Sequence, residues 1–407
     1  MARFLFIHQN FPGQFRHLAP ALAAAGHEVV ALGMRSNVEK LPGVRYFMHQ
    51  ARVPAGGAEQ PAQLRDLLSK VLRGESASAA LARLKEQGFV PDTVFVHPGW
   101  GESLFVRDVF PHARILVYAE YYYSAEGGDS FFDPEFSKPP TLAELQRLRL
   151  RNTHLMHALS DADAALSPTQ FQRNRHPAWC REKISVIHDG IDTERFRPDA
   201  GASVSLAAAG VALRPGDEVV TFVSRQLEPY RGYHIFMRAL PELLRLRPNA
   251  RVVIVGGDGV SYGAAAPAGK TWKAIFRDEV APELDMRRVH FVGKLPHELL
   301  TQLMQVSAVY TYLTYPFVLS WSLLEAMSAG CLVVGSRTAP LEEVIEHGRN
   351  GLLTDFFDPQ ALAHTVADAL ERRGSLGALR EAARQTMVER YDLHRHCLPA
   401  QMRFMLA

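Results

Sequence analysis

Short apolar runs alternate with longer amphipathic segments along most of the chain. In the first half these runs predict strands at residues 4–8, 27–32, 93–97, 115–119, 164–167 and 184–187. The first two flank a turn at residues 10–14 and an Ala-rich helical segment at residues 15–25, which is the pattern of a βαβ unit. Because such units build parallel sheets covered on both faces, we expect a doubly wound α/β domain.

The same pattern begins again after an Ala-, Gly-, Ser- and Pro-rich stretch at residues 199–217, which we interpret as a linker or surface loop. We therefore predict an α/β protein of two Rossmann-like doubly wound domains that face a central cleft. The domains are placed at residues 1–195 and 196–385, and residues 386–407 form a helical segment that is expected to pack back on the first domain. The second set of strands is predicted at residues 219–224, 251–256, 290–292, 308–313 and 332–335.

Composition excludes several classes of protein. The chain has 45 Lys and Arg against 43 Asp and Glu, a net charge of +2, which argues against a nucleic-acid partner. Its three widely spaced cysteines fit a reducing cytoplasm, and its 17 histidines show no paired metal-ligand spacing, so we predict no metal and no cofactor. The charge-free stretch 299–324 contains Pro316 and many polar residues, which favours buried soluble structure over a membrane span.

Two arginines follow the predicted strand 219–224. Arg225 and Arg231 would lie at the carboxyl end of that strand, where ligands bind, and their planar donors suit phosphate oxygens. Two solvated loop arginines are the alternative. The glycine-rich turn that begins at Gly256, and Gly13 before the first helix, would let backbone approach a ligand, although a plain tight turn explains each equally well.

Glu325 is the only charge in a long apolar segment. A buried carboxylate needs a partner, and ribose hydroxyls in a ligand would supply one. The alternative is a capping box, in which Ser322 begins the helix and Glu325 serves its start. The residues alone leave both interpretations open.

Several motifs occur in a characteristic order. They are Asn-Phe-Pro-Gly-Gln-Phe at 10–15, His-Asp-Gly-Ile-Asp at 188–192, Arg225 with Arg231-Gly232, Leu-Glu-Ala-Met-Ser-Ala-Gly at 324–330 and Gly-Arg-Asn-Gly at 348–351. Together they resemble the motifs of the retaining glycosyltransferases of family 4. The resemblance covers most of the chain and is strongest between residues 184 and 353.

This resemblance implies a GT-B fold, in which the second domain holds a nucleotide-sugar donor and the first faces the acceptor. Arg225 and Arg231 would then clamp the diphosphate, and Glu325 would hold the ribose. The other donor-binding positions would be Gly13 from the first domain, Gly256, Lys294 and Leu295 against the base, and the amides near Ser320, Trp321 and Ser322 against the sugar or phosphate.

The chain departs clearly from the family in one place, and it has Arg231 where the family more often has Lys. The family carries two glutamates separated by seven residues, and Phe317 stands where the first is expected. We hypothesise that Ser320 and backbone amides replace that carboxylate. His97 follows a strand, should point at the cleft and resembles a histidine-bearing loop of the family; a core histidine is the alternative. Glu120 stands where many relatives have His, and an acidic residue beside the tyrosines at 121–123 suits sugar or acceptor hydroxyls; a buried, hydrogen-bonded glutamate is the alternative. The resemblance makes both candidate catalytic residues.

The resulting expectation is a metal-independent, retaining glycosyltransferase that moves a sugar from a UDP-, GDP- or ADP-sugar to an acceptor hydroxyl of a glycan, a lipid-linked molecule or a small molecule. The alternatives are a sugar-nucleotide epimerase on the same fold and a catalytically silent, nucleotide-binding GT-B subunit. We expect a cytoplasmic protein with at most peripheral contact at the inner membrane face, because the basic segment 64–85 lacks Trp or Phe anchors and favours a solvated helix face.

Overall fold

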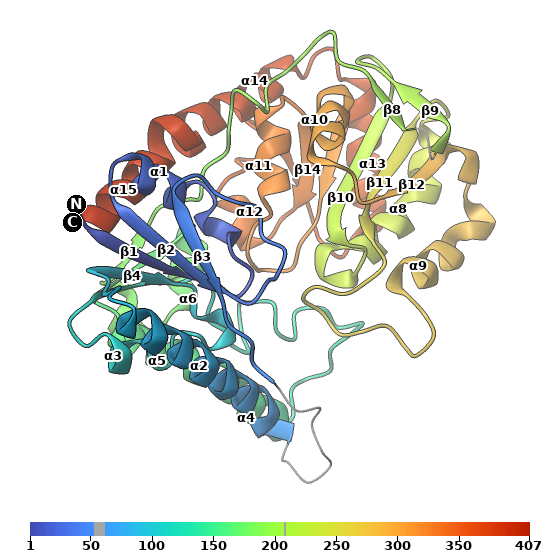
Figure 1. The fold of residues 1–407 in the computed structure, drawn as a ribbon. Helices are drawn as coiled ribbons and strands as arrows, with labels where there is room; N and C mark the ends of the chain where they lie inside the picture. The colour runs from blue at the N-terminus through green and yellow to red at the C-terminus, as the bar shows by residue number, and fades with distance from the viewer. Residues whose placement is uncertain (53–61, 207–208) are drawn as a thin grey trace. The chain divides into compact units, whose positions relative to one another are not determined.

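The chain divides into two units. The computed structural model describes residues 1–52, 62–206 and 209–407, and the first unit comprises Met1–Asp189 with His394–Ala407, the second Gly190–Leu393 (Figure 1). The predicted boundaries at 195 and 385 differ from these because Ile191 belongs to the second unit. Its amide donates to the Tyr391 carbonyl and its carbonyl accepts from Leu393, at 2.8 and 2.9 Å.

The first unit contains a seven-stranded parallel sheet in the order β3-β2-β1-β4-β5-β6-β7. Pairing is in register, with Arg3 opposite Glu28 and Ile7 opposite Leu32. The strand order reverses between β1 and β4, which makes their carboxyl ends the topological switch point of this sheet. The strands are β1 (Arg3–Ile7), β2 (Glu28–Gly33), β3 (Val44–Met48), β4 (Thr93–Val96), β5 (Arg114–Tyr118), β6 (Ala164–Ser167) and β7 (Ile184–Val186).

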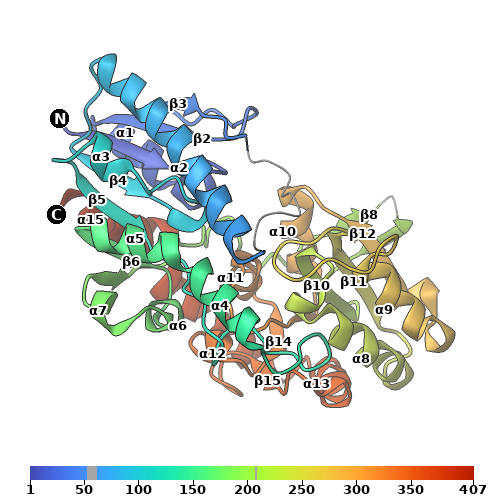
Figure 2. The ribbon, with the colours of Figure 1, turned by 90° about the horizontal axis from the view of Figure 1, so that it is seen from below.

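Helices cover both faces of this sheet (Figure 2). Because side chains alternate along β1, Leu5 and Ile7 pack towards α2 and α5, whereas Phe4 and Phe6 pack towards α1 and α15. The C-terminal helix thus belongs to the core of the first unit. The helices are α1 (Leu18–Ala24), α2 (Ala62–Glu86), α3 (Val106–Val109), α4 (Leu142–Arg151), α5 (Thr153–Asp161), α6 (Gln170–Arg175), α7 (Ala178–Arg181) and α15 (Leu398–Leu406).

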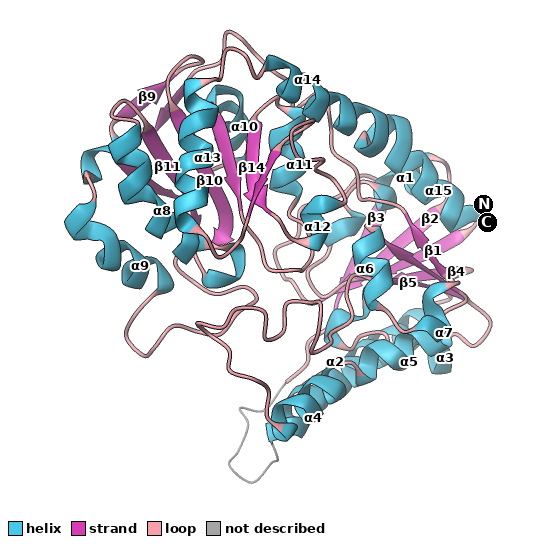
Figure 3. Ribbon diagram, turned by 180° about the vertical axis from the view of Figure 1, so that it is seen from behind, coloured by secondary structure: helices cyan, strands magenta, loops and turns pink. Residues whose placement is uncertain are grey.

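The second unit contains a six-stranded parallel sheet in the order β12-β11-β10-β13-β14-β15, with its switch point between β10 and β13. Figure 3 shows helices flanking these strands. The predicted α/β class with two doubly wound sheets is confirmed. The strands are β10 (Val219–Gln226), β11 (Arg251–Gly257), β12 (Val289–Gly293), β13 (Val309–Tyr312), β14 (Leu332–Ser336) and β15 (Leu352–Thr354).

Two sets of helices enclose the second sheet. Helices α8, α9 and α13 pack together, and α10, α11 and α14 share a core cluster with β13 and β14. The helices are α8 (Tyr233–Leu246), α9 (Trp272–Val280), α10 (His297–Val306), α11 (Trp321–Ser328), α12 (Ala339–Glu342), α13 (Pro359–Glu371) and α14 (Gly377–Thr386).

The prediction of a linker or surface loop at 199–217 is wrong for the central residues of that stretch. The stretch contains an antiparallel hairpin of β8 (Val204–Leu206) and β9 (Val211–Leu213), and residues 207 and 208 of the predicted linker lie outside the described residues. Val204, Leu206 and Leu213 are buried against α10 and β11, so the hairpin is part of the second core. Apolar and polar positions alternate over only three residues in each of these strands, so the Ala, Gly and Ser content of the stretch led to the prediction of a linker.

The stretch 299–324 is divided between α10, β13 and the start of α11, so it forms no single continuous helix. Across the described part of the chain, no helix combines the length and the hydropathy needed to cross a membrane. The basic segment 64–85 lies in α2, which buries Ala77 and Leu81 and leaves Arg65, Arg83 and Lys85 exposed.

Candidate active site

The carboxyl ends of β10, β11 and β12 bring three predicted residues to one edge of the second sheet. Arg225 is exposed near the end of β10, Gly256 lies near the end of β11, and exposed Lys294 follows β12. A side chain on Gly256 would lie 2.7 Å from Leu227 Cδ2 and 2.9 Å from the Ser224 carbonyl oxygen. The close packing of backbone here explains the glycine without a ligand.

Arg231 is buried and is held in place by one of its terminal nitrogens. Nη1 donates to Tyr312 Oη at 3.0 Å, Thr314 Oγ1 at 2.8 Å and the Val318 carbonyl at 3.0 Å. Burial opposes its charge, but the hydroxyls of nearby tyrosines, Tyr312 first, outweigh burial and leave the guanidinium pKa above its ordinary value. Arg231 is therefore a fixed cation at the switch point, and the solvated-loop alternative is wrong for this residue while Arg225 remains exposed.

Aromatic rings surround Arg231, and Phe317 is one of them. The guanidinium carbon of Arg231 lies 5.1 Å from the centre of the Tyr262 ring and 6.0 Å from that of Phe317. Phe317 is buried and packs edge-on against Tyr230, with ring centres 5.1 Å apart. The position where the family has its first glutamate is thus part of an aromatic cluster that contacts the cation.

Glu228 is a buried carboxylate that the sequence analysis missed. It accepts hydrogen bonds from the amides of Ser261, Tyr262 and Gly263 at 3.1, 3.4 and 3.2 Å. Burial raises the pKa of Glu228, and these amide bonds act in the opposite direction. Glu228 thus fixes the loop after β11 and places Tyr262 beside Arg231. The sequence feature that could have identified it is a single carboxylate in the turn between the two predicted arginines.

Glu325 does not cap its helix. The N-cap of α11 is Ser320, whose side chain accepts from the Ser322 amide at 3.3 Å, so Glu325 lies beyond the first turn and the capping-box alternative is wrong. The Glu325 carboxylate instead lies 3.4 Å from Nε2 of His297, the first residue of α10. His297 was not predicted, although it directly follows the turn assigned to the nucleotide base.

The remaining predicted donor residues differ in their surroundings. The Ser320 amide donates to Tyr312 Oη at 2.8 Å, and its hydroxyl also lies 2.9 Å from that of Ser322, so these polar groups have partners within the protein. Trp321 is 39% exposed. Leu295 is half-buried and packs against the core that includes the β8–β9 hairpin. The structure brings Ser320 close to Arg231 through the shared Tyr312 hydroxyl.

A chain of polar contacts joins three strand ends in the first unit. His97 Nδ1 accepts from the Gly99 amide at 3.2 Å, which leaves its Nε2 to face Glu120 Oε2 at 3.3 Å. Gln14 Nε2 donates to Glu120 Oε1 at 2.7 Å, and Gln14 Oε1 lies 2.9 Å from His8 Nε2. His97 and Glu120 are therefore brought together, at the ends of neighbouring strands β4 and β5 next to the switch point.

Gly13 makes room for His8. Its φ is +47°, and a Cβ there would lie 2.4 Å from His8 Nε2. The Asn10 amide donates to His8 Nδ1 at 2.9 Å, so the proton of the neutral ring is on Nε2, directed to Gln14. Burial, assisted by His97, lowers the pKa of His8 well below its ordinary value and keeps the ring neutral. The glycine loop thus has a structural cause within the first unit.

The two edges are those at which doubly wound sheets bind nucleotides and sugars, and comparison with known proteins defines the class. A family model described as "Glycosyl transferase family 4 group" matches residues 25–196, and one described as "Glycosyl transferases group 1" matches residues 208–386. The two matches follow each other along the chain, in the order that the motifs predicted. The chain belongs to glycosyltransferase family 4.

Its sequence relatives include D-inositol 3-phosphate glycosyltransferases. The one from Streptomyces avermitilis is 28% identical over 240 residues, which are 56% of this chain and 49% of that protein. The one from Corynebacterium urealyticum is 29% identical over 228 residues, 55% of this chain and 51% of the relative. The chain thus spans about half the length of the curated relatives it matches.

Solved structures share the fold over the whole chain. Anabaena Alr3699/HepE in complex with UDP and glucose has a TM-score of 0.69 at 17% identity, covering 100% of this chain and 99% of that one. Sucrose-phosphate synthase from Thermosynechococcus elongatus has a TM-score of 0.73 at 19% identity, covering 99% and 98%. At this level of identity the likeness concerns the fold alone.

Proposed function

We propose that this protein transfers a sugar from a nucleotide-diphosphate sugar to an acceptor hydroxyl and retains the anomeric configuration. The observation that carries the proposal is Arg231, a buried guanidinium fixed at the switch point of the second sheet. A permanent cation at this place suits a diphosphate, and holding it there costs desolvation that a bound anion would offset. Family membership supplies the reaction class.

In the proposed reaction, Arg225 and Arg231 stabilise the charge that grows on the departing diphosphate. Arg231 needs no rearrangement to do so because three acceptors fix it beforehand. Glu325 accepts hydrogen bonds from the ribose hydroxyls, and Lys294 and Leu295 lie against the base. The acceptor hydroxyl attacks from the face of the leaving group, with a donor phosphate oxygen as the base, which is why no protein nucleophile is assigned.

UDP-glucose is the first donor to test, because solved structures of similar fold contain UDP, glucose or UDP-glucose. The names of the sequence relatives make inositol 3-phosphate one acceptor to test. In a thermal-shift panel of UDP, GDP and ADP sugars, the donor should raise Tm by mass action. NMR of the product should then show the donor's anomeric configuration; inversion, or the absence of any stabilising donor, would refute the proposal.

A binding-only role is the second candidate, and Phe317 is the observation that favours it. A phenyl ring cannot accept hydrogen bonds from donor-sugar hydroxyls as the family's glutamate does. A protein of this kind would be stabilised by the nucleotide yet would neither transfer nor hydrolyse the sugar. The same panel, followed by measurement of free sugar and product, separates the two functions.

A further inference from the structure

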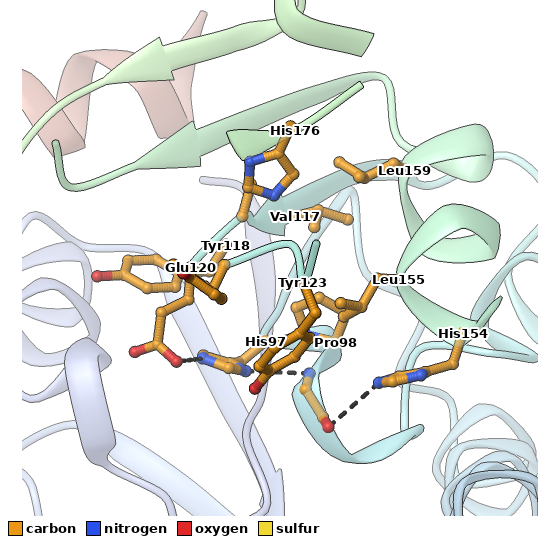
Figure 4. A pocket seen from close by; sticks show the side chains of 13 residues that line it. His97, Pro98, Val117, Tyr118, Glu120, Tyr123, His154, Leu155, Leu159 and His176 are labelled. Atoms are coloured by element: carbon orange, nitrogen blue, oxygen red, sulfur yellow. Dashed lines mark hydrogen bonds and ion pairs between the residues drawn. The ribbon is translucent and has the colours of Figure 1, made fainter. Parts of the chain in front are cut away.

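The first unit contains a cavity of about 40 Å³ beside His97 and Glu120. At roughly 10–15 Å³ for each water molecule, it has room for about three waters, or for one hydroxyl-bearing carbon group of a larger ligand. Figure 4 shows His97 and Glu120 on one side of it and His154 on the other. It is lined by His97, Pro98, Gly99, Val117, Tyr118, Ala119, Glu120, Tyr121, Tyr123, His154, Leu155, Leu159 and His176.

His154 offers this cavity an acceptor with no partner. Its side chain is buried at 2% exposure, and its Nε2 lies 3.2 Å from the Gly99 carbonyl, to which it donates. Nδ1 is then the lone-pair nitrogen, and within the described residues it has no hydrogen-bond partner. Burial, the main cause, lowers the pKa of His154 to about 4, so Nδ1 stays an acceptor at neutral pH. A buried polar atom of this kind calls for an explanation, and a donor hydroxyl in a ligand provides one.

The lining favours a neutral ligand. Glu120 contributes a carboxylate, and in the part of the chain that the structure describes neither lysine nor arginine lines the cavity. The guanidinium of Arg151 stacks on the ring of Tyr123, 3.6 Å from its centre, and is not among the lining groups. Burial lowers the pKa of His176 to about 4, so this ring adds no positive charge at neutral pH. A phosphate would meet the Glu120 carboxylate with no lysine or arginine among the described lining residues, since Lys70 and Arg151 act on His154 from outside the lining.

The apolar part of the lining suits the C–H surface of a neutral, hydroxyl-bearing ligand. Val117, Leu155 and Leu159 lie together on one wall in Figure 4, and Tyr123 presents its ring nearby. Aliphatic and aromatic surfaces pack against C–H bonds, while His154 Nδ1 and the Glu120 carboxylate accept from O–H groups. This pairing of walls is suited to a sugar or a polyol.

We infer that this cavity binds a neutral, hydroxyl-bearing group of the acceptor, such as a hydroxymethyl group or one edge of a sugar or polyol ring, and discriminates against phosphate on that group. The inference rests on the proposed function and deepens it, because it names the chemical class that the acceptor side takes. It assigns to His154 Nδ1 and Glu120 the recognition of hydroxyl donors.

The test is saturation-transfer NMR on the full chain, with and without UDP. The probes are glucose, myo-inositol and glycerol, each beside its monophosphate. Two variants of α5 form a matched pair: Leu159→Trp fills the cavity, whereas Met156→Trp adds the same ring at a position that is 43% exposed. We expect at least one neutral probe to bind ten times more tightly than its phosphate, and Leu159→Trp but not Met156→Trp to lose that binding.

Three results would overturn the inference: no neutral probe binds, a phosphate binds as tightly as its neutral partner, or Leu159→Trp binds like the wild type. If Leu159→Trp does not fold, Ala119→Val narrows the same cavity with two methyl groups and should weaken binding of the neutral probe; unchanged binding would equally overturn it. Donor consumption is measured separately. A chain that binds neutral probes yet is stabilised by no sugar nucleotide of the panel and consumes none would refute the proposed function, while the preference of the cavity for neutral hydroxyl-bearing groups would stand.

Discussion

Replacing Arg231 by lysine tests the centre of the proposed function while keeping the charge. The two N–H groups of Arg231 Nη1 are shared among three acceptors, which leaves the other guanidinium donors for a phosphate oxygen. An ammonium group has three donors but lacks the planar fork that can serve the protein and a phosphate at once. Loss of one charged donor aimed at a developing anion costs about 2–3 kcal/mol of transition-state stabilisation. The expected fall in kcat/KM is therefore roughly 30- to 160-fold.

The stability cost should be smaller than the catalytic cost. If the ammonium group satisfies two of the three acceptors, about 1 kcal/mol is lost, which lowers Tm by roughly 2–4 °C for a unit of this size. The matched control is Arg238→Lys on α8, whose guanidinium pairs with Glu279 at 2.5 Å on the surface. Steady-state kinetics with UDP-glucose and a melting curve for each variant complete the measurement. A folded Arg231→Lys enzyme with kcat/KM within threefold of the wild type would refute the need for a planar guanidinium, and unchanged turnover in Arg231→Ala would refute the assignment of the diphosphate.

Other variants and conditions test neighbouring claims. Glu325→Gln should weaken UDP binding about tenfold by calorimetry with little change in Tm, because Glu325 does not cap α11; a lower Tm with unchanged affinity would contradict this. Glu228→Gln should release the loop at 261–263, raising the donor KM severalfold and its amide hydrogen-exchange rates, and unchanged exchange would exclude the positioning role. Gly13→Ala should lower Tm by several degrees, because the new Cβ would clash with the His8 ring. The control Gly374→Ala should change Tm little, because its Cβ meets open space, and equal changes in Tm would contradict the clash.

Acid should destabilise the first unit. Burial, first among the causes, lowers the pKa of His49, His154, His176 and His188 to about 4, and all four lie in this unit. Between pH 6.5 and 4 the unfolded chain binds protons that the folded unit does not, so stability falls as pH falls, by about 1–2 kcal/mol per histidine at pH 5. Calorimetry at pH 7 and pH 5 should show a lower Tm for this unit, and a constant Tm would contradict the burial argument.

The strands that form the middle of each sheet were predictable from the sequence because burial on both faces makes them continuous apolar runs. The edge strand β3 was not, since Val44, Tyr46 and Phe47 are only half-buried and the others exposed. The hairpin at 204–213 was concealed by composition. Short elements of this kind depend on contacts with distant residues, which local patterns do not report.

The site was predictable in its residues more than in their roles. The motif order identified Arg231 and Glu325, but burial of Arg231 depends on Tyr312 and Thr314, far away in sequence and brought near by the pairing of β10 with β13. Gly13 was assigned to a donor, whereas its immediate contact is the His8 ring. Partners such as His297 and Glu228 carry no motif and appear only when the chain is folded.

The electrostatic contrast between the two sheet edges supports the proposal that the second unit binds the donor and the first unit binds the acceptor. At the edge of the second sheet the fixed group is a guanidinium within a cluster of tyrosines and Phe317, which favours an anion such as a diphosphate. At the edge of the first, the Glu120 carboxylate is linked through Gln14 to the neutral His8 ring, and His154 Nδ1 is an acceptor without a partner among the described residues; both groups favour hydroxyl donors over anions. A transfer reaction needs both properties, because its leaving group becomes more negative while its nucleophile must give up a proton. In the proposed function, each sheet edge would supply one of these properties.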